Sequence, residues 1–176
     1  MKRFVLPLFA GILFLILQTT LLSVLPIQRI RPDILLIFTL YLTFLFPPIL
    51  GGILAMFLGY LMDLFSGSAF GFYTFSRPLL FFAAYFFKER FYLEGFSSQF
   101  LFAFAFEMLE GVLILILLDA LQPVSLGNLI PVLLTSLLPQ SVFTGLLTPI
   151  LFFLFQKASS PLFRQPEQEI KERAQL

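Results

Sequence analysis

The chain has 176 residues, of which 59% are hydrophobic and only 12% are charged, and its formal net charge is +1. Soluble domains carry about 25% charged residues, so this chain has too little charge to cover a surface in contact with water. The mean hydropathy of +0.98 also excludes a disordered chain, because disorder requires low hydrophobicity and high charge. An integral membrane protein that consists almost entirely of its membrane domain remains.

The residue types that are missing exclude several kinds of chemistry. With no His and no Cys, the chain has no imidazole for acid–base catalysis, no thiol nucleophile, no disulfide and no ligand set typical of zinc. A net charge of +1 without a basic stripe argues against nucleic acid as a partner. We therefore expect no catalytic residue, no metal site and no cofactor.

Six apolar segments are predicted to span the membrane. A span requires about 20 mostly apolar residues, and residues 4–25 form a charge-free run too long for the apolar region of a signal peptide. Pro47 and Pro48 interrupt the next run, which forms either one kinked helix or two short spans. The predicted spans are about 4–25, 34–46, 49–65, 72–87, 98–118 and 129–155.

The distribution of Lys and Arg favours an even number of spans. Basic residues gather in the cytoplasmic flanks of membrane proteins, and both ends of this chain are basic. With six spans, Arg29 and Arg31 lie outside and Arg77 lies within a span. The eight basic residues inside are Lys2, Arg3, Lys88, Arg90, Lys157, Arg164, Lys171 and Arg173. We therefore predict a six-span membrane domain over residues 1–156, a cytoplasmic tail over residues 157–176 and both termini in the cytoplasm.

Charged residues inside the predicted spans point to a polar cluster. Such residues are rare and usually face the protein interior. With a rise of about 1.5 Å per residue, Arg77 lies about 9 Å and Glu110 about 12 Å below the outer surface. We predict that Arg77 pairs with Glu110, with Asp63 as the next candidate partner. Glu107 lies one turn from Glu110 on the same face without an obvious partner, whereas Asp63 and Asp119 lie near the outer boundary.

The cluster of Asp63, Arg77, Glu107 and Glu110 has three interpretations from the sequence. The first is an ion pair that fixes the fold. The second is a polar pocket or partner-docking patch open to the outer leaflet. The third is a path for protons or ions. Intramembrane charges occur in all three roles, so the sequence leaves them open.

A stripe of small residues runs along the third predicted span. Gly51, Ala55, Gly59 and Asp63 recur at every fourth position. Small residues at this spacing allow close approach of two helix backbones. The stripe either packs against another span of the same chain or forms a groove for the transmembrane helix of a partner. Asp63 or Ser66 is also placed to cap nearby backbone amides.

Catalysis has little support in the sequence. No Gly-x-Ser-x-Gly motif is present, and a hydrolase triad would lack its His. Glu107 and Glu110 are the candidates for proton transfer, but pairing with Arg77 explains them without catalysis. We therefore predict that the chain is not an enzyme.

Two stretches of the first half resemble the MreD family of rod shape-determining proteins. The resemblance rests on Arg31-Pro32-Asp33 before the second span and on residues 59–71, GYLMDLFSGSAFG. The features shared with the family are a Pro-Asp pair that opens this span, followed by a glycine, an Asp and a Gly-x-x-x-Gly-like turn around the end of the third. The length, the six spans and the short basic tail are also similar.

The resemblance implies an all-α, six-helix bundle similar to the S-components of vitamin transporters. It implies a non-enzymatic scaffold of the cell-wall elongation machinery, the elongasome, in the bacterial inner membrane. The partner implied is MreC, a protein with one transmembrane helix and a periplasmic coiled-coil part. Through MreC, the chain would connect to MreB filaments, RodA and penicillin-binding protein 2, which act in peptidoglycan synthesis at the lateral cell wall.

The alternative is a small-molecule binding subunit of a transporter, similar to an S-component. Those proteins carry small residues at every fourth position of their first helix, where the energising partner docks. Here Ala10 and Gly11 are followed four residues later by Phe14 and Leu15. This difference counts against the transporter subunit.

Overall fold

The computed structural model describes residues 2–24, 32–66, 71–88, 95–121, 131 and 133–159. These residues are helical apart from short connections, and the described part of the chain contains no β-strand. The helices are α1 (Lys2–Val24), α2 (Ile34–Leu45), α3 (Pro48–Ser66), α4 (Phe72–Phe87), α5 (Phe96–Leu121), the π-helix η2 (Leu133–Leu137) and α7 (Leu138–Ser159). The predicted all-α fold is therefore confirmed.

The helices coincide with the six predicted apolar segments, and η2 with α7 forms the last of them. Within the described residues, three stretches are long and apolar enough to cross a membrane: Pro48–Ser66, Phe96–Ala120 and Leu133–Lys157. Two shorter helical stretches, Pro7–Thr20 and Ile34–Leu45, are also apolar. The chain is therefore a helical membrane protein, whereas the count of six crossings stays a prediction.

The proline pair separates α2 from α3, so that the run forms two helices rather than one kinked helix. Phe46 ends α2 in an extended conformation with φ −123° and ψ 148°, because a following proline disfavours helical backbone. Its amide still donates a 3.0 Å hydrogen bond to the carbonyl oxygen of Leu42. Pro48 opens α3, where its missing N–H removes no helical hydrogen bond.

α2 forms the centre of the bundle and packs against α1, α3, α4, α5 and α7. Its residues 35–43 are all buried, which suits a helix that is apolar all round. The two threonines of this stretch satisfy their hydroxyl groups within the helix, since Thr39 donates to the carbonyl oxygen of Leu35 and Thr43 to that of Leu40. The helix therefore presents an apolar surface on every side.

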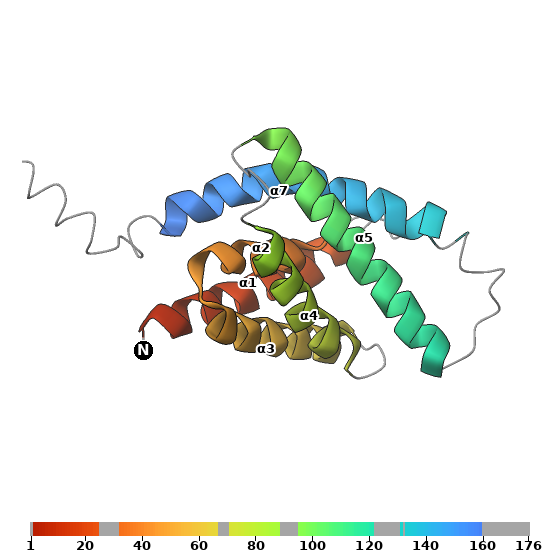
Figure 1. The fold of residues 1–176 in the computed structure, drawn as a ribbon, viewed down its shortest axis with the longest axis horizontal. Coiled ribbons are helices and arrows are strands. Elements are labelled where there is room, and N and C mark those ends of the chain that lie inside the picture. The colour runs from red at the N-terminus through yellow and green to blue at the C-terminus, as the bar shows by residue number, and fades with distance from the viewer. Residues whose placement is uncertain are drawn as a thin grey trace, which may run out of the picture.

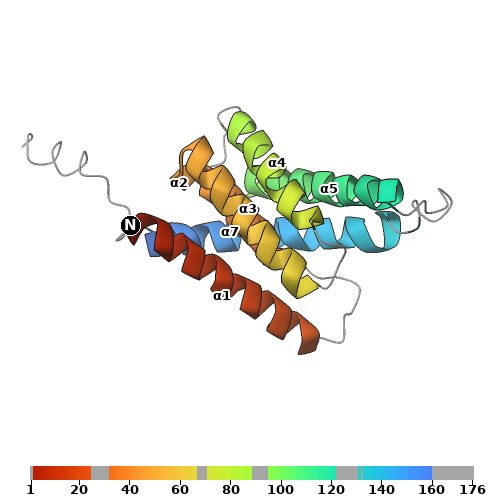
Figure 2. The same ribbon diagram turned by 90° about the horizontal axis from the view of Figure 1, so that it is seen from below.

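Two antiparallel helix pairs, α3 with α4 and α5 with α7, surround this centre. Figure 1 shows α7 across the top of the view and α3 along the bottom, with α2 and α4 between them. α1 packs against α2 and α3 and lies along one edge of the bundle in Figure 2. α4 also contacts α2 and α5, so it connects the α3/α4 pair to the α5/α7 pair directly as well as through α2.

Several predictions concern residues outside the described ranges. Most of the residues that decided the predicted orientation are among them: Arg29, Arg31, Arg90, Arg164, Lys171 and Arg173. The orientation of the chain in the membrane therefore stays a prediction. α7 extends to Ser159, so the predicted boundary between membrane domain and tail falls inside this helix.

Candidate functional site

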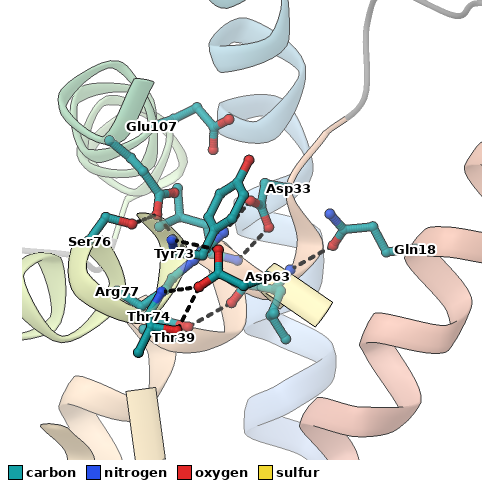
Figure 3. Close-up of polar contacts among 12 residues, drawn as sticks. Gln18, Asp33, Thr39, Asp63, Tyr73, Thr74, Ser76, Arg77 and Glu107 are labelled. Atoms are coloured by element: carbon teal, nitrogen blue, oxygen red, sulfur yellow. Dashed lines mark hydrogen bonds and ion pairs between the residues drawn. The ribbon is translucent and has the colours of Figure 1, made fainter. Parts of the chain in front are cut away.

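A buried arginine on α4 joins three helices. Arg77 is 0% exposed and lies between Asp33, at the start of α2, and Glu110 on α5. Its Nη2 atom is ion-paired with Asp33 Oδ2, and its Nε atom lies 3.1 Å from Glu110 Oε1. Ser76 donates a 2.8 Å hydrogen bond to the same Glu110 oxygen. The predicted pair of Arg77 and Glu110 is therefore confirmed, and Figure 3 shows Asp33 as a further neighbour.

Asp33 was not among the predicted site residues. It is the N-cap of α2, and its Oδ1 atom accepts a 2.8 Å hydrogen bond from the amide of Leu36. Its own amide donates to Thr144 Oγ1 of α7, and the amide of Leu35 donates to Gln18 Oε1 of α1, both at 3.1 Å. An Asp directly before an apolar run is a typical N-cap signal, and this signal would have drawn attention to the residue.

Glu107 lies one turn from Glu110 on α5 and faces the same cluster. Gln140 of α7 donates a 2.6 Å hydrogen bond to Glu107 Oε1, so the residue has a partner that the sequence did not indicate. The second carboxyl oxygen, Oε2, is buried and has no hydrogen-bond partner in the described structure. Figure 3 shows this carboxyl group directed toward Tyr73 and Asp33.

A partly open cavity of about 210 Å³ lies beside the carboxyl groups. Its polar wall is formed by Asp33, Tyr73, Glu107, Glu110, Ser136 and Gln140. Apolar side chains of α5 and the π-helix η2 complete the wall. Single π-helical turns are frequent at functional sites, and here one borders the cavity.

Asp63, the second predicted partner of Arg77, binds the start of α4 instead. It is 2% exposed, so it is not a hydrated residue at the outer boundary. Its carboxyl group accepts hydrogen bonds from the amides of Tyr73 and Thr74 at 3.0 and 2.8 Å, and from Thr74 Oγ1 at 2.6 Å. α4 begins after Gly71, which has no side chain to cap it, so Asp63 caps this helix from α3. The predicted capping role is confirmed.

The small-residue stripe of α3 faces α4. A Cβ atom added to Gly51 would lie 2.0 Å from the ring of Phe81, and one added to Gly59 would lie 2.2 Å from the carbonyl oxygen of Tyr73. Ala55 between them is fully buried. The stripe is therefore occupied by another helix of the same chain, as the packing interpretation required, and its surface is covered.

The cluster brings carboxyl groups together without a catalytic partner. One carboxylate oxygen each from Asp33, Glu107 and Glu110 lie within 4.8 Å of one another. Carboxylate oxygens accept hydrogen bonds and bind hard cations such as Ca²⁺ and Mg²⁺. The chain has no His or Cys, so these carboxyl groups have no imidazole or thiol beside them. The arrangement can therefore tie helices together and attract a cation.

The comparison with known families places this fold and this cluster in context. The profile of the family described as "rod shape-determining protein MreD" matches residues 2–158. Searches among curated proteins and among solved structures gave no match. The matched range contains Asp33, Asp63, Arg77, Glu107 and Glu110 and nearly all of the chain. The chain therefore belongs to the MreD family of rod shape-determining membrane proteins.

Proposed function

We propose that the chain is a non-enzymatic membrane scaffold of the bacterial cell-wall elongation machinery that docks the transmembrane helix of an MreC-like partner. Membership of a rod shape-determining family supports this role. The proposal places the chain in the bacterial cytoplasmic membrane as a six-span bundle with both termini in the cytoplasm. The MreC-like partner then connects it to MreB filaments, RodA and penicillin-binding protein 2.

The observation that carries this proposal is the use of buried polar groups to hold helices together. Arg77 joins α4 to α2 and α5. Thr144 and Gln18 attach α7 and α1 to the start of α2. Each contact connects different helices, and an unpaired polar group in the membrane interior would be costly. A scaffold requires such fixed helix positions, because a partner helix recognises the outer surface that they define.

The partner helix is proposed to dock on an outward-facing surface rather than on the small-residue stripe, which α4 covers. Large apolar side chains point outward on four of the long helices. Examples are Phe9 on α1, Met56 on α3, Leu109 on α5 and Phe153 on α7, with exposed fractions of 48–69%. In a membrane, each of these faces meets either lipid or another helix.

The cavity beside the cluster keeps the transporter-subunit alternative under consideration. Ligand pockets measure about 300–1,000 Å³, and this cavity of about 210 Å³ lies below that range. A vitamin-sized molecule would therefore need the cavity to open further. The smaller volume favours the scaffold over an S-component-like binding subunit.

A pull-down of the tagged full-length protein from its native membrane tests the proposed function. Mass spectrometry should find a near-stoichiometric protein with one transmembrane helix and a coiled-coil ectodomain. A retained ATPase module or a vitamin-like solute would instead identify a transporter subunit. An enzyme would retain neither kind of companion.

Site-specific photo-crosslinking then locates the docking surface. A photoreactive amino acid is placed in turn at Phe9, Met56, Leu109 and Phe153, with buried Leu54 as the matched negative control. We expect crosslinks to the single-span partner from the exposed positions of one face and none from Leu54. If the protein complements shape in cells but none of the four exposed positions crosslinks, these faces do not carry the docking.

A further inference from the structure

The three carboxyl groups of the cluster converge from two parts of the chain. Asp33 precedes α2, whereas Glu107 and Glu110 lie one turn apart on α5. One carboxylate oxygen of each lies within 4.8 Å of those of the other two. The three residues are 3–4% exposed and line the same cavity.

The cluster contains more carboxyl groups than cationic side chains. Among the described residues, Arg77 is the cationic side chain of this group, and it is shared between Asp33 and Glu110. A bound cation requires the three carboxyl groups to be ionised, and one guanidinium then leaves two negative charges without a counter-charge. A charge taken out of water without a partner is costly, so the ionised form of the cluster requires an additional cation.

A second observation, a buried carboxyl oxygen without a partner, indicates where an additional cation would bind. Glu107 Oε2 is buried without a hydrogen-bond partner, although Gln140 binds the other oxygen of the same group. The residue forms part of the cavity wall and its carboxyl group is directed toward Tyr73 and Asp33 (Figure 3). The carboxyl group that carries the unused oxygen therefore lines the cavity together with Asp33 and Glu110.

The spacing and the chemistry of the three oxygens fit a calcium ion. Ca²⁺ binds oxygen at about 2.3–2.6 Å, so ligands on opposite sides of the ion are up to about 5 Å apart. Three oxygens that all lie within 4.8 Å of one another fit this span. Ca²⁺ also accepts irregular ligand sets, whereas Mg²⁺ requires near-octahedral geometry and gives up its waters reluctantly. Carboxylate ligands without His or Cys also select hard cations.

The cavity has room for such an ion and for part of its hydration shell. Its volume of about 210 Å³ compares with about 30 Å³ for one water molecule in the liquid. Ca²⁺ takes 6–8 oxygen ligands, so water and the nearby oxygen atoms of Tyr73 and Gln140 would complete the set. We infer that Asp33, Glu107 and Glu110 form a binding site for one divalent cation of the calcium type. This inference does not depend on the scaffold function.

Binding of Mn²⁺ to the purified full-length protein tests the site. Electron paramagnetic resonance measures free Mn²⁺, whose six-line signal decreases as the ion binds. We expect saturable binding of one Mn²⁺ per chain, displaced by Ca²⁺ and not by Na⁺ at equal ionic strength. Failure to saturate at one ion per chain would overturn the proposal. Displacement by ethanolamine where Ca²⁺ has no effect would show an ammonium site and would also overturn it.

Matched variants assign the binding to the cluster. Glu107→Gln should lower the Mn²⁺ affinity by at least about ten-fold. Even the loss of a residue that only hydrogen-bonds to a metal ligand lowers metal affinity by about that factor. Asp119→Asn removes the same charge about 18 Å further along α5 and should bind as the wild type does. Equal affinities of the wild type and Glu107→Gln would overturn the assignment, as would an equal loss in both variants.

A second variant keeps the test decisive if Glu107→Gln does not give a monodisperse protein. Glu107→Asp retains the carboxyl group but shortens its reach by one methylene group. We expect it to fold and to bind Mn²⁺ more weakly than the wild type. Unchanged affinity in Glu107→Asp would show that this oxygen does not contact the ion and would exclude the proposed ligand set.

Discussion

Two groups of buried carboxylates contact α4, and they are satisfied to different degrees. In the α3/α4 contact, formed by Gly51, Ala55, Gly59 and Asp63, the one carboxyl group accepts three hydrogen bonds from the start of α4. In the polar cluster, formed by Asp33, Arg77, Glu107 and Glu110, one guanidinium serves two carboxyl groups and a third has an unpaired oxygen. The first region is a completed structural contact, whereas the second retains capacity to bind.

The largest effect is expected when the polar cluster loses the positive charge of Arg77. Arg77→Met removes the partner of Asp33 and Glu110 and leaves buried carboxyl groups without a counter-charge. Breaking a buried ion pair from one side costs about 3–5 kcal/mol, so we expect this loss in the free energy of unfolding. Unfolding in mixed micelles with increasing SDS, followed by circular dichroism, measures it.

Arg77→Lys is the control for this substitution. An ammonium group keeps the charge but cannot contact two carboxyl groups through a planar fork, so an intermediate loss is expected. If Arg77→Met were as stable as the wild type, the carboxyl groups would carry no charge that requires Arg77. The comparison between the two regions would then lose its electrostatic basis.

The next largest effect concerns the close approach of α3 and α4. In Gly59→Ala the new Cβ would lie 2.2 Å from the carbonyl oxygen of Tyr73, and a backbone atom cannot move without separating the helices. Overpacking of this kind costs about 1–3 kcal/mol. The same SDS titration should show a loss of unfolding free energy in that range.

Gly52→Ala on the same helix is the matched control. Its Cβ would meet the tip of the Phe82 ring at 2.6 Å, and this exposed side chain can rotate away. Ala is favoured over Gly in a helix interior by about 1 kcal/mol, so Gly52→Ala should be neutral or stabilising. Equal stability of both variants would show that the two helix backbones are not in close contact at Gly59.

The features that could be predicted from the sequence depend on composition, on single residues and on helix geometry. The charge-poor composition indicated a membrane protein, and the proline pair marked the break between α2 and α3. The Arg77–Glu110 pair was predictable because both depths follow from helix rise along straight segments. Asp33 was missed because it lies outside the apolar runs, and only the packing of α2 in the centre of the bundle brings it to Arg77. The partner of Glu107 was missed because only the packing of the helices brings it there: Gln140 lies 33 residues further along the chain, on another helix.

The cap of α4 should give a smaller effect. The amides of Tyr73 and Thr74 bind different oxygens of Asp63, so Asp63→Asn keeps an acceptor for one of them and places an NH₂ group, itself a donor, against the other. Loss of an N-cap typically costs about 1 kcal/mol, and we expect a decrease of that size in the unfolding free energy. Asp119→Asn removes a carboxylate near the C-terminal end of α5 rather than at its start and should change stability by less. A loss in Asp119→Asn equal to that in Asp63→Asn would indicate a general effect of removing a carboxylate.

The smallest effect, and one of opposite sign, is expected at Glu107. Glu107→Gln retains an oxygen that accepts from Gln140 and replaces the unpaired oxygen by an NH₂ group, which can donate to the neighbouring carboxyl groups. A buried polar group that gains a partner is less costly, so in the presence of a chelator the variant should be at least as stable as the wild type. Added Ca²⁺ should reverse this order, because it stabilises only the protein that binds it. Asp63→Asn should show the same loss with chelator and with Ca²⁺, since its carboxylate already has its donors. The contrary outcome is that Ca²⁺ changes neither the stability difference between the wild type and Glu107→Gln nor that between the wild type and Asp63→Asn. In that outcome the unpaired oxygen of the cluster binds no metal, and the two regions differ only in how completely their hydrogen bonds are formed.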